Sequence, residues 1–356
     1  RVDFKRFLAT FIPFHRPLFP GTPFSASTLA GVYLNTETPQ KMNIRIVNWS
    51  PARRSRTIEV FLKRPAFDSD AEKIAADMLA DIKSRGESAV LAGIAKFEGV
   101  SLKPSELRVS DAEFKDAESK IPEKIKKLIN EAHDRVADFS RQSMRKDWKV
   151  ATRHGGTLGE YYSPLDRVGI YVPGGTAPLA STVIMTATLA QVAGVPEIVA
   201  CTPGGKTKQI NAAMLYAMHV SGVTEVYRVG GIQAIGMMAY GVRHCNPVRK
   251  IVGPGGTFVT AAKRQVYGTV ALDLVAGPSE IAILADDSAN PEFVAADLLS
   301  QAEHGTGFEK AMFVTNSPDL AQEVTAAITR QTAKLTRRNL IRRVTDASGI
   351  LLIVAP

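Results

Sequence analysis

The chain has 356 residues, enough for two or three domains, and its 45% hydrophobic and 22% charged residues exclude wholesale disorder, a coiled coil and a collagen-like fibre. The formal charge is +9, but residues 1–65 hold 11 Lys/Arg against 3 Asp/Glu, so the remainder is nearly neutral and no nucleic-acid partner is expected. Two cysteines cannot form a disulfide framework, which favours a reducing, cytoplasmic setting.

Residues 1–41 differ from the rest of the chain. They hold six of the fifteen Phe and five of the twenty Pro, show no helical or strand period, and precede the first methionine, Met42. Three interpretations stay open: sequence foreign to the native protein, a transit peptide that would place the protein in an organelle, or a structured extension. We leave this stretch out of the fold prediction and treat 42–65 as a short N-terminal segment.

Residues 68–150 are expected to be helical. Asp68 is a candidate helix cap, and Ser110 with Glu113 has the spacing of a capping box. Pro122 is expected in the first turn of a further helix, followed by an amphipathic apolar stripe.

From Arg167 onward the pattern changes to strands that end in glycines. Four β-rich runs, 167–172, 197–201, 225–229 and 250–252, are each followed by a glycine cluster. Helix-like stretches lie at 181–193, 209–220, 234–240 and 257–267. This alternation predicts a parallel sheet covered on both faces, with ligands at the carboxyl ends of the strands. Glycines there let backbone N–H groups approach a phosphate, so a nucleotide-type cofactor is expected, although tight turns alone would also explain single clusters.

Two further features of the sequence each allow a functional and a purely structural interpretation. The uncharged stretch 177–196 is long enough to cross a bilayer, but its polar residues and terminal prolines favour a buried helix, so no membrane partner is expected. Gln301 and His304 share one face of a helix predicted to start near Pro291. They are candidate zinc ligands, and a polar helix end explains the pair equally simply.

Five stretches together resemble the histidinol dehydrogenase family. They are 167–175 (RVGIYVPGG), 229–235 (VGGIQAI), 250–255 (KIVGPG), 276–280 (AGPSE) and 297–304 (DLLSQAEH), and the resemblance covers about 55–356. The resemblance implies a zinc-dependent homodimer that oxidises L-histidinol through the aldehyde to L-histidine in two NAD-dependent steps, the last reaction of histidine biosynthesis.

Residue by residue, the resemblance assigns Tyr171 and Gln233 to NAD binding. It places Gly256 where the family has an NAD-contacting Asn, so we expect Gly256→Asn to tighten NAD binding. Ser279, Gln301 and His304 match substrate-binding positions, and the last two also match two of the four zinc ligands.

The family's catalytic Glu-His pair and its other two zinc ligands lie beyond Pro356. We therefore expect no catalytic residue within this chain and a nearly inactive fragment. Two alternatives stay open: a related NAD-dependent dehydrogenase acting on another small hydroxylated substrate, and a non-catalytic binding module.

The expected fold class is α/β, with two Rossmann-like, doubly wound parallel-sheet domains and a helical N-terminal region. By resemblance, 66–170 plus 279–356 form one discontinuous domain, and 171–278 form a second domain inserted into it.

Overall fold

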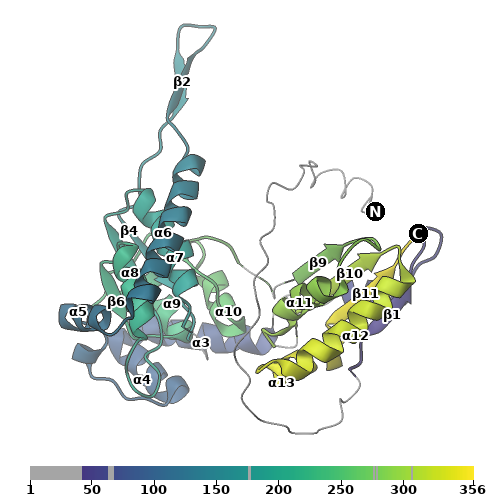
Figure 1. The fold of residues 1–356 in the computed structure, drawn as a ribbon. Coiled ribbons are helices and arrows are strands. Elements are labelled where there is room, and N and C mark those ends of the chain that lie inside the picture. The colour runs from purple at the N-terminus through teal and green to yellow at the C-terminus, as the bar shows by residue number, and fades with distance from the viewer. Residues whose placement is uncertain (1–41, 63–67, 175–177, 276, 278–279, 306–307) are drawn as a thin grey trace. The chain divides into compact units, whose positions relative to one another are not determined.

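The structure is a computed structural model that describes residues 42–62, 68–174, 178–275, 277, 280–305 and 308–356. The expected N-terminal extension, 1–41, lies outside the described residues. The elements form two layered groups, each described by itself: a five-stranded domain (68–275) and a four-stranded domain (42–62 and 280–356) (Figure 1).

A parallel five-stranded sheet is the centre of the first group, in the order β6-β5-β4-β7-β8. Its strands are β4 (Arg167–Tyr171), β5 (Glu197–Cys201), β6 (Glu225–Tyr227), β7 (Lys250–Val252) and β8 (Ala271–Leu272). The four predicted strands are confirmed to within two residues, and β8 is an additional short edge strand. Because the chain adds β5 and β6 on one side of β4 and β7 and β8 on the other, the strand order reverses between β4 and β7.

Helices cover both faces of this sheet. One face packs against α3 (Ser69–Arg85), α4 (Glu87–Glu98), α9 (Gly231–Tyr240) and α10 (Thr257–Val266). The other packs against α5 (Asp111–Ser119), α6 (Glu123–Ser143), α7 (Ala180–Val192) and α8 (Ala212–Val220). Along β4, Ile170 and Tyr171 face opposite cores, as the two-residue period of a strand requires. The predicted α/β fold with a doubly wound parallel sheet is therefore confirmed.

Local signals start the helices where the sequence predicts. Asp68 accepts hydrogen bonds from the N–H groups of Asp70 and Ala71 at the start of α3. Ser110 and Glu113 form the expected capping box of α5. Pro122 is the residue just before α6, one position earlier than its predicted place in the first turn. A 3-10 turn, η1 (Pro104–Glu106), connects α4 to α5.

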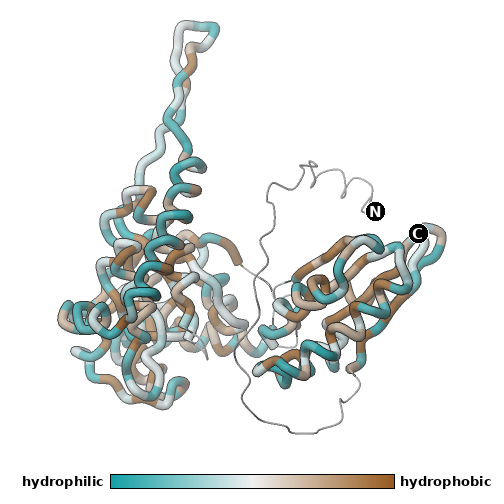
Figure 2. Tube along the Cα trace, viewed as in Figure 1, coloured by the Kyte–Doolittle hydropathy of each residue, from teal (hydrophilic) through white to brown (hydrophobic). Residues whose placement is uncertain are grey.

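The stretch 177–196 contains α7, one face of which is buried in the five-stranded domain, while Met185 and Leu189 on the helix are exposed. No helix within the described ranges is both long and apolar enough for a bilayer crossing. Figure 2 shows the contrast within this domain: hydrophobic residues line the strands, whereas the outer helix α6 is mostly hydrophilic.

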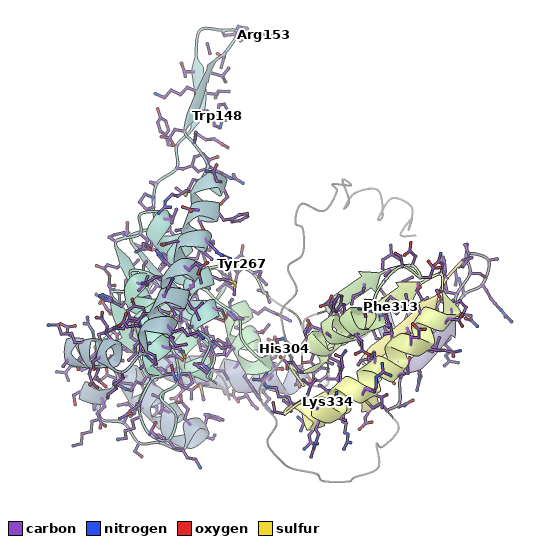
Figure 3. The ribbon with its side chains drawn as sticks, in the orientation of Figure 1. Trp148, Arg153, Tyr267, His304, Phe313 and Lys334 are labelled. Atoms are coloured by element: carbon purple, nitrogen blue, oxygen red, sulfur yellow. The ribbon has the colours of Figure 1, made fainter. Side chains whose placement is uncertain are left out.

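The prediction of helix up to residue 150 is wrong at its end. Residues 148–160 form an antiparallel hairpin of β2 (Trp148–Ala151) and β3 (Thr157–Glu160), whose residues are all exposed. The Trp148 indole N–H donates to Glu160 at 2.8 Å, and Arg153 lies at the tip (Figure 3). A strand pair depends on a partner further along the chain, which a helical period cannot reveal.

The four-stranded sheet is also parallel, in the order β1-β11-β10-β9. Its strands are β1 (Arg45–Asn48), β9 (Glu280–Leu284), β10 (Lys310–Thr315) and β11 (Ile350–Val354). One face, including Phe313, packs against α11 (Pro291–Ala302), α12 (Pro318–Lys334) and α13 (Arg338–Asp346) (Figure 3). On the other face, Phe61 of α2 (Arg56–Leu62) packs against Leu351 and Ile353.

The domain boundaries differ from the expected ones. Residues 66–170 were expected to join 279–356, but α3 to α6 pack against α8, α9, α10 and α7, and β4 is the central strand of the five-stranded sheet. The four-stranded sheet is completed instead by β1, from the segment 42–65. The strands of the five-stranded sheet all lie between β1 and β9 in the sequence, which belong to the four-stranded sheet.

Candidate functional site

The strand-order reversal between β4 and β7 is the place where a doubly wound sheet binds its ligand. Tyr171 is the last residue of β4, and Gly253 directly follows β7. Gly253 has φ +121°, and a Cβ there would overlap the carbonyl oxygen of Tyr171. Glycine is therefore required at 253 so that the ends of the two strands can come close together.

Tyr171 is 5% exposed. Its hydroxyl oxygen accepts a hydrogen bond from the Gly231 N–H at 3.2 Å, at the start of α9. Burial raises the pKa of Tyr171 to about 12, so the phenol is neutral at physiological pH. Within the described residues its O–H donates to no group, which leaves that proton available for an acceptor on a ligand.

Glu98, at the end of α4, binds the backbone amide of Gly230, which precedes that of Gly231. Its Oε1 accepts the Gly230 N–H at 2.9 Å. Burial raises the pKa of Glu98 from its ordinary value, although the bond to Gly230 acts in the opposite direction. The first two amides of the α9 terminus are thus bound by acceptors from β4 and α4 rather than left open.

Gln233 lies in the first turn of α9 and is 3% exposed. Its side chain packs against Gly93 of α4, where an added Cβ would lie 2.5 Å from the Gln233 Cγ. The absence of a side chain at residue 93 therefore makes room for the Gln233 amide and restricts where it can lie.

Gly256 is the residue just before α10, with φ −71° and ψ −177°, a conformation open to any residue. No atom lies within 4 Å of the place where its Cβ would be. Position 256 therefore has room for a larger side chain, in contrast to position 253.

A cavity of about 470 Å³ lies at the carboxyl ends of β4 and β5, with Tyr171 in its wall. The loop after β5 forms another part of the wall, including Gly204 and Gly205. Buried Arg228 holds this loop, because its guanidinium donates to the Lys208 carbonyl at 2.8 Å as well as to η1 and to Glu113. Of the three predicted NAD-binding residues, Tyr171 lines this cavity, whereas Gln233 and Gly256 are not among its lining residues.

The predicted metal residues lie in the four-stranded domain. Gln301 is in the last turn of α11, and His304 lies two residues beyond the end of that helix rather than on it (Figure 3). Among the described residues, the Gln301 Nε2 is buried and has no hydrogen-bond partner, whereas His304 is exposed. Ser279 lies outside the described residues.

Zinc fits these residues only in part. Exchanging the amide atoms of Gln301 would put its oxygen, a metal-binding atom, at the buried and unpartnered position. Gln301 and His304 are two donors, however, and the described part of the chain holds no group of three or more His, Cys, Asp or Glu placed for a metal ion. A tetrahedral zinc site needs about four ligands, so these two residues alone do not make one.

Sequence reasoning missed Glu98 and Arg228. Both act on backbone groups more than 100 residues away, the Gly230 N–H and the Glu106 carbonyl respectively. A capping acceptor within its own helix has a fixed spacing, but these contacts have none, so no signal in the sequence could have found them.

The fold and this strand-end site define a Rossmann-like α/β protein. The family model described as histidinol dehydrogenase matches residues 62–356. The histidinol dehydrogenase of Symbiobacterium thermophilum is 40% identical over 292 residues, covering 82% of this chain and 66% of that protein. That of Geobacillus kaustophilus is 41% identical over 277 residues, covering 78% and 65%.

A crystal structure of histidinol dehydrogenase from Elizabethkingia anophelis superposes with a TM-score of 0.79 at 33% identity, covering 88% of this chain and 71% of that one. The chain therefore belongs to the histidinol dehydrogenase family. It spans about two thirds of the length of the curated relatives named above.

Proposed function

We propose that this chain carries the dinucleotide-binding part of an enzyme that oxidises L-histidinol to L-histidine in two NAD-dependent steps, at the end of histidine biosynthesis. Family membership over 62–356 is the observation that carries the proposal. It is supported by the position of Tyr171, Gln233 and Gly256 at or just after the carboxyl ends of β4, β6 and β7. That is the edge of a doubly wound sheet where nucleotides bind.

In this proposal the protein binds and orients the cofactor, and NAD accepts the hydride at each step. The neutral Tyr171 hydroxyl donates a hydrogen bond to the dinucleotide, because its oxygen already accepts the Gly231 N–H. Gln233 offers an amide whose position is restricted by packing against Gly93. Gly256 offers only its backbone.

We further propose that Gln301 and His304 supply two zinc ligands and contact the substrate together with Ser279. The buried, unpartnered amide atom of Gln301 supports this assignment. Zinc, when bound, would act as a Lewis acid toward the substrate. By the same resemblance, the active protein is a homodimer that works in the cytoplasm.

The first experiment is a calorimetric titration of the purified chain with NAD, with Gln233→Met as a variant that keeps the side-chain volume and loses the amide. We expect saturable binding that the variant weakens. Absence of binding by the unaltered chain would overturn the dinucleotide assignment.

The second experiment follows NADH formation with L-histidinol as substrate. By the resemblance, the family's catalytic Glu-His pair belongs to a Pro-Glu-His-Leu segment, and no such segment occurs among the 356 residues. Because general acid–base groups contribute roughly 10²–10⁴-fold in rate, we expect turnover to be lower than in a full-length relative by about that factor. Turnover equal to the relative's would refute the fragment hypothesis, and a preference for another amino alcohol would favour the related-dehydrogenase alternative.

A further inference from the structure

A buried ion pair lies beside the strand-order reversal, and no function has been assigned to it above. Lys263, in α10, is 4% exposed, and its ammonium group donates to Asp273 Oδ1 at 2.5 Å. Asp273 directly follows β8, and its side chain is 27% exposed. The pair thus joins a helix to the end of the sheet's edge strand.

Both members of the pair bind the backbone of the same residue in the loop after β7, Gly253. The Lys263 ammonium also donates to the Gly253 carbonyl at 2.8 Å, and Asp273 Oδ2 accepts the Gly253 N–H at 2.9 Å. Asp273 Oδ1 accepts the N–H of Leu274 as well, which fixes the carboxylate itself. The backbone donor and acceptor of Gly253 are therefore both bound by one pair of side chains.

Gly253 is the residue whose position affects the whole site. Its φ of +121° and its close approach to the Tyr171 carbonyl leave it little room. Three residues later the chain reaches Gly256 and the start of α10. A shift of the Gly253 peptide would therefore move the loop that carries Gly256 relative to Tyr171.

Stability alone is a weak explanation for this pair. Removing a lysine ammonium from water costs several kcal/mol, and replacing a buried ion pair by apolar residues of similar volume is often neutral or stabilising. A lysine side chain on a helix points back toward its N-terminus, so Lys263 is well placed to reach the loop that precedes its own helix.

We propose that Lys263 and Asp273 are positioning residues for the dinucleotide: they hold the Gly253 peptide so that the loop to Gly256 stays in its binding conformation against Tyr171. The proposal deepens the NAD-binding role proposed above and rests on it for the identity of the ligand. Neither residue is required to touch the cofactor.

The test compares the unaltered chain with the double variant Lys263→Met/Asp273→Asn, which removes both charges together and so leaves no isolated buried ion. If the loss of the pair lowers the binding-competent fraction of the loop to about one tenth, the Kd for NAD rises about tenfold. Lys310→Met is the matched control. Lys310 is 8% exposed and its partner Glu280 is mostly exposed, and both residues lie in the four-stranded domain, away from Gly253 in the sequence.

We expect the double variant to remain folded, to bind NAD about tenfold more weakly, and to exchange the amide hydrogens of 253–256 faster. The control should change neither the Kd nor that exchange. An unchanged Kd and unchanged exchange in the double variant would overturn the proposal. If the unaltered chain does not bind NAD, the proposed function fails, and the exchange rates still decide whether the pair fixes Gly253.

Discussion

Replacing Gly256 by Asn should tighten NAD binding. The resemblance implies an NAD-contacting Asn at this position, and the structure leaves space for it, since no atom lies within 4 Å of an added Cβ and the backbone has φ −71°. One neutral hydrogen bond contributes roughly 0.5–1.5 kcal/mol. At 1.4 kcal/mol per factor of ten, this corresponds to a Kd lower by roughly 2- to 12-fold.

The control is Gly256→Ala, which fills the same space without an amide. Both variants add a Cβ before α10, so a change in loop entropy affects both, and only the Asn variant gains a hydrogen-bonding group. Isothermal titration of NAD into the three proteins at one salt concentration measures the difference. Equal Kd values for the Asn and Ala variants would refute the reasoning.

A competing outcome can be recognised by a separate measurement. Residue 256 caps α10, and Asn is a better cap than Gly by a few tenths of a kcal/mol, since its side chain accepts a hydrogen bond from the first turn. If the Asn side chain is used in this way, the unfolding midpoint rises and the Kd stays constant. A lower Kd with little change in the unfolding midpoint is the result that supports a contact with NAD.

Three further predictions concern stability. Burial raises the pKa of Glu98 above its ordinary value, so the wild-type protein loses stability as pH rises through that raised pKa. The stabilising effect of Glu98→Gln in thermal unfolding should therefore grow from acidic to neutral pH. A difference between the two proteins that does not depend on pH would contradict this. Gly253→Ala combines a positive φ with overlap of the Tyr171 carbonyl and should destabilise by roughly 2–5 kcal/mol in urea unfolding, against less than about 1 kcal/mol for Gly256→Ala. Arg228→Met leaves three backbone carbonyls and one carboxylate without their donor, so the free energy of unfolding in urea should fall by roughly 2–4 kcal/mol. A decrease below about 1 kcal/mol would show that water replaces these hydrogen bonds.

The parallel sheet could be predicted because its signals are local. Buried strands are short apolar runs, and glycines follow them where the chain turns into a helix. The predicted strand at 250–252 matches β7, Lys250–Val252, and the helix predicted at 257–267 matches α10 to within one residue.

Features that depend on distant partners could not be predicted in this way. The strand β1 gains its hydrogen bonds from β11, about 300 residues later, and the hairpin at 148–160 was assigned to a helical region. The apolar positions of α3 and α4 show that these helices pack on something, but not on which sheet, so the sequence pattern alone does not assign them to a domain.

The candidate site was predictable only where a motif carries the residue. The resemblance assigned Tyr171, Gln233 and Gly256, and their roles stay predictions. Glu98, Lys263 and Asp273 were not identified, because each binds backbone groups whose positions only the folded chain defines.

These backbone contacts bear on how the dinucleotide is bound. In many nucleotide-binding folds an open helix N-terminus contributes much of the affinity for the phosphates. Here the first amides of α9 already bind Glu98 and Tyr171, so the phosphates gain less from that terminus. NAD affinity should then depend more strongly on side-chain contacts than on the α9 terminus. A single amide group, whether removed at Gln233 or introduced at Gly256, should therefore change the Kd measurably.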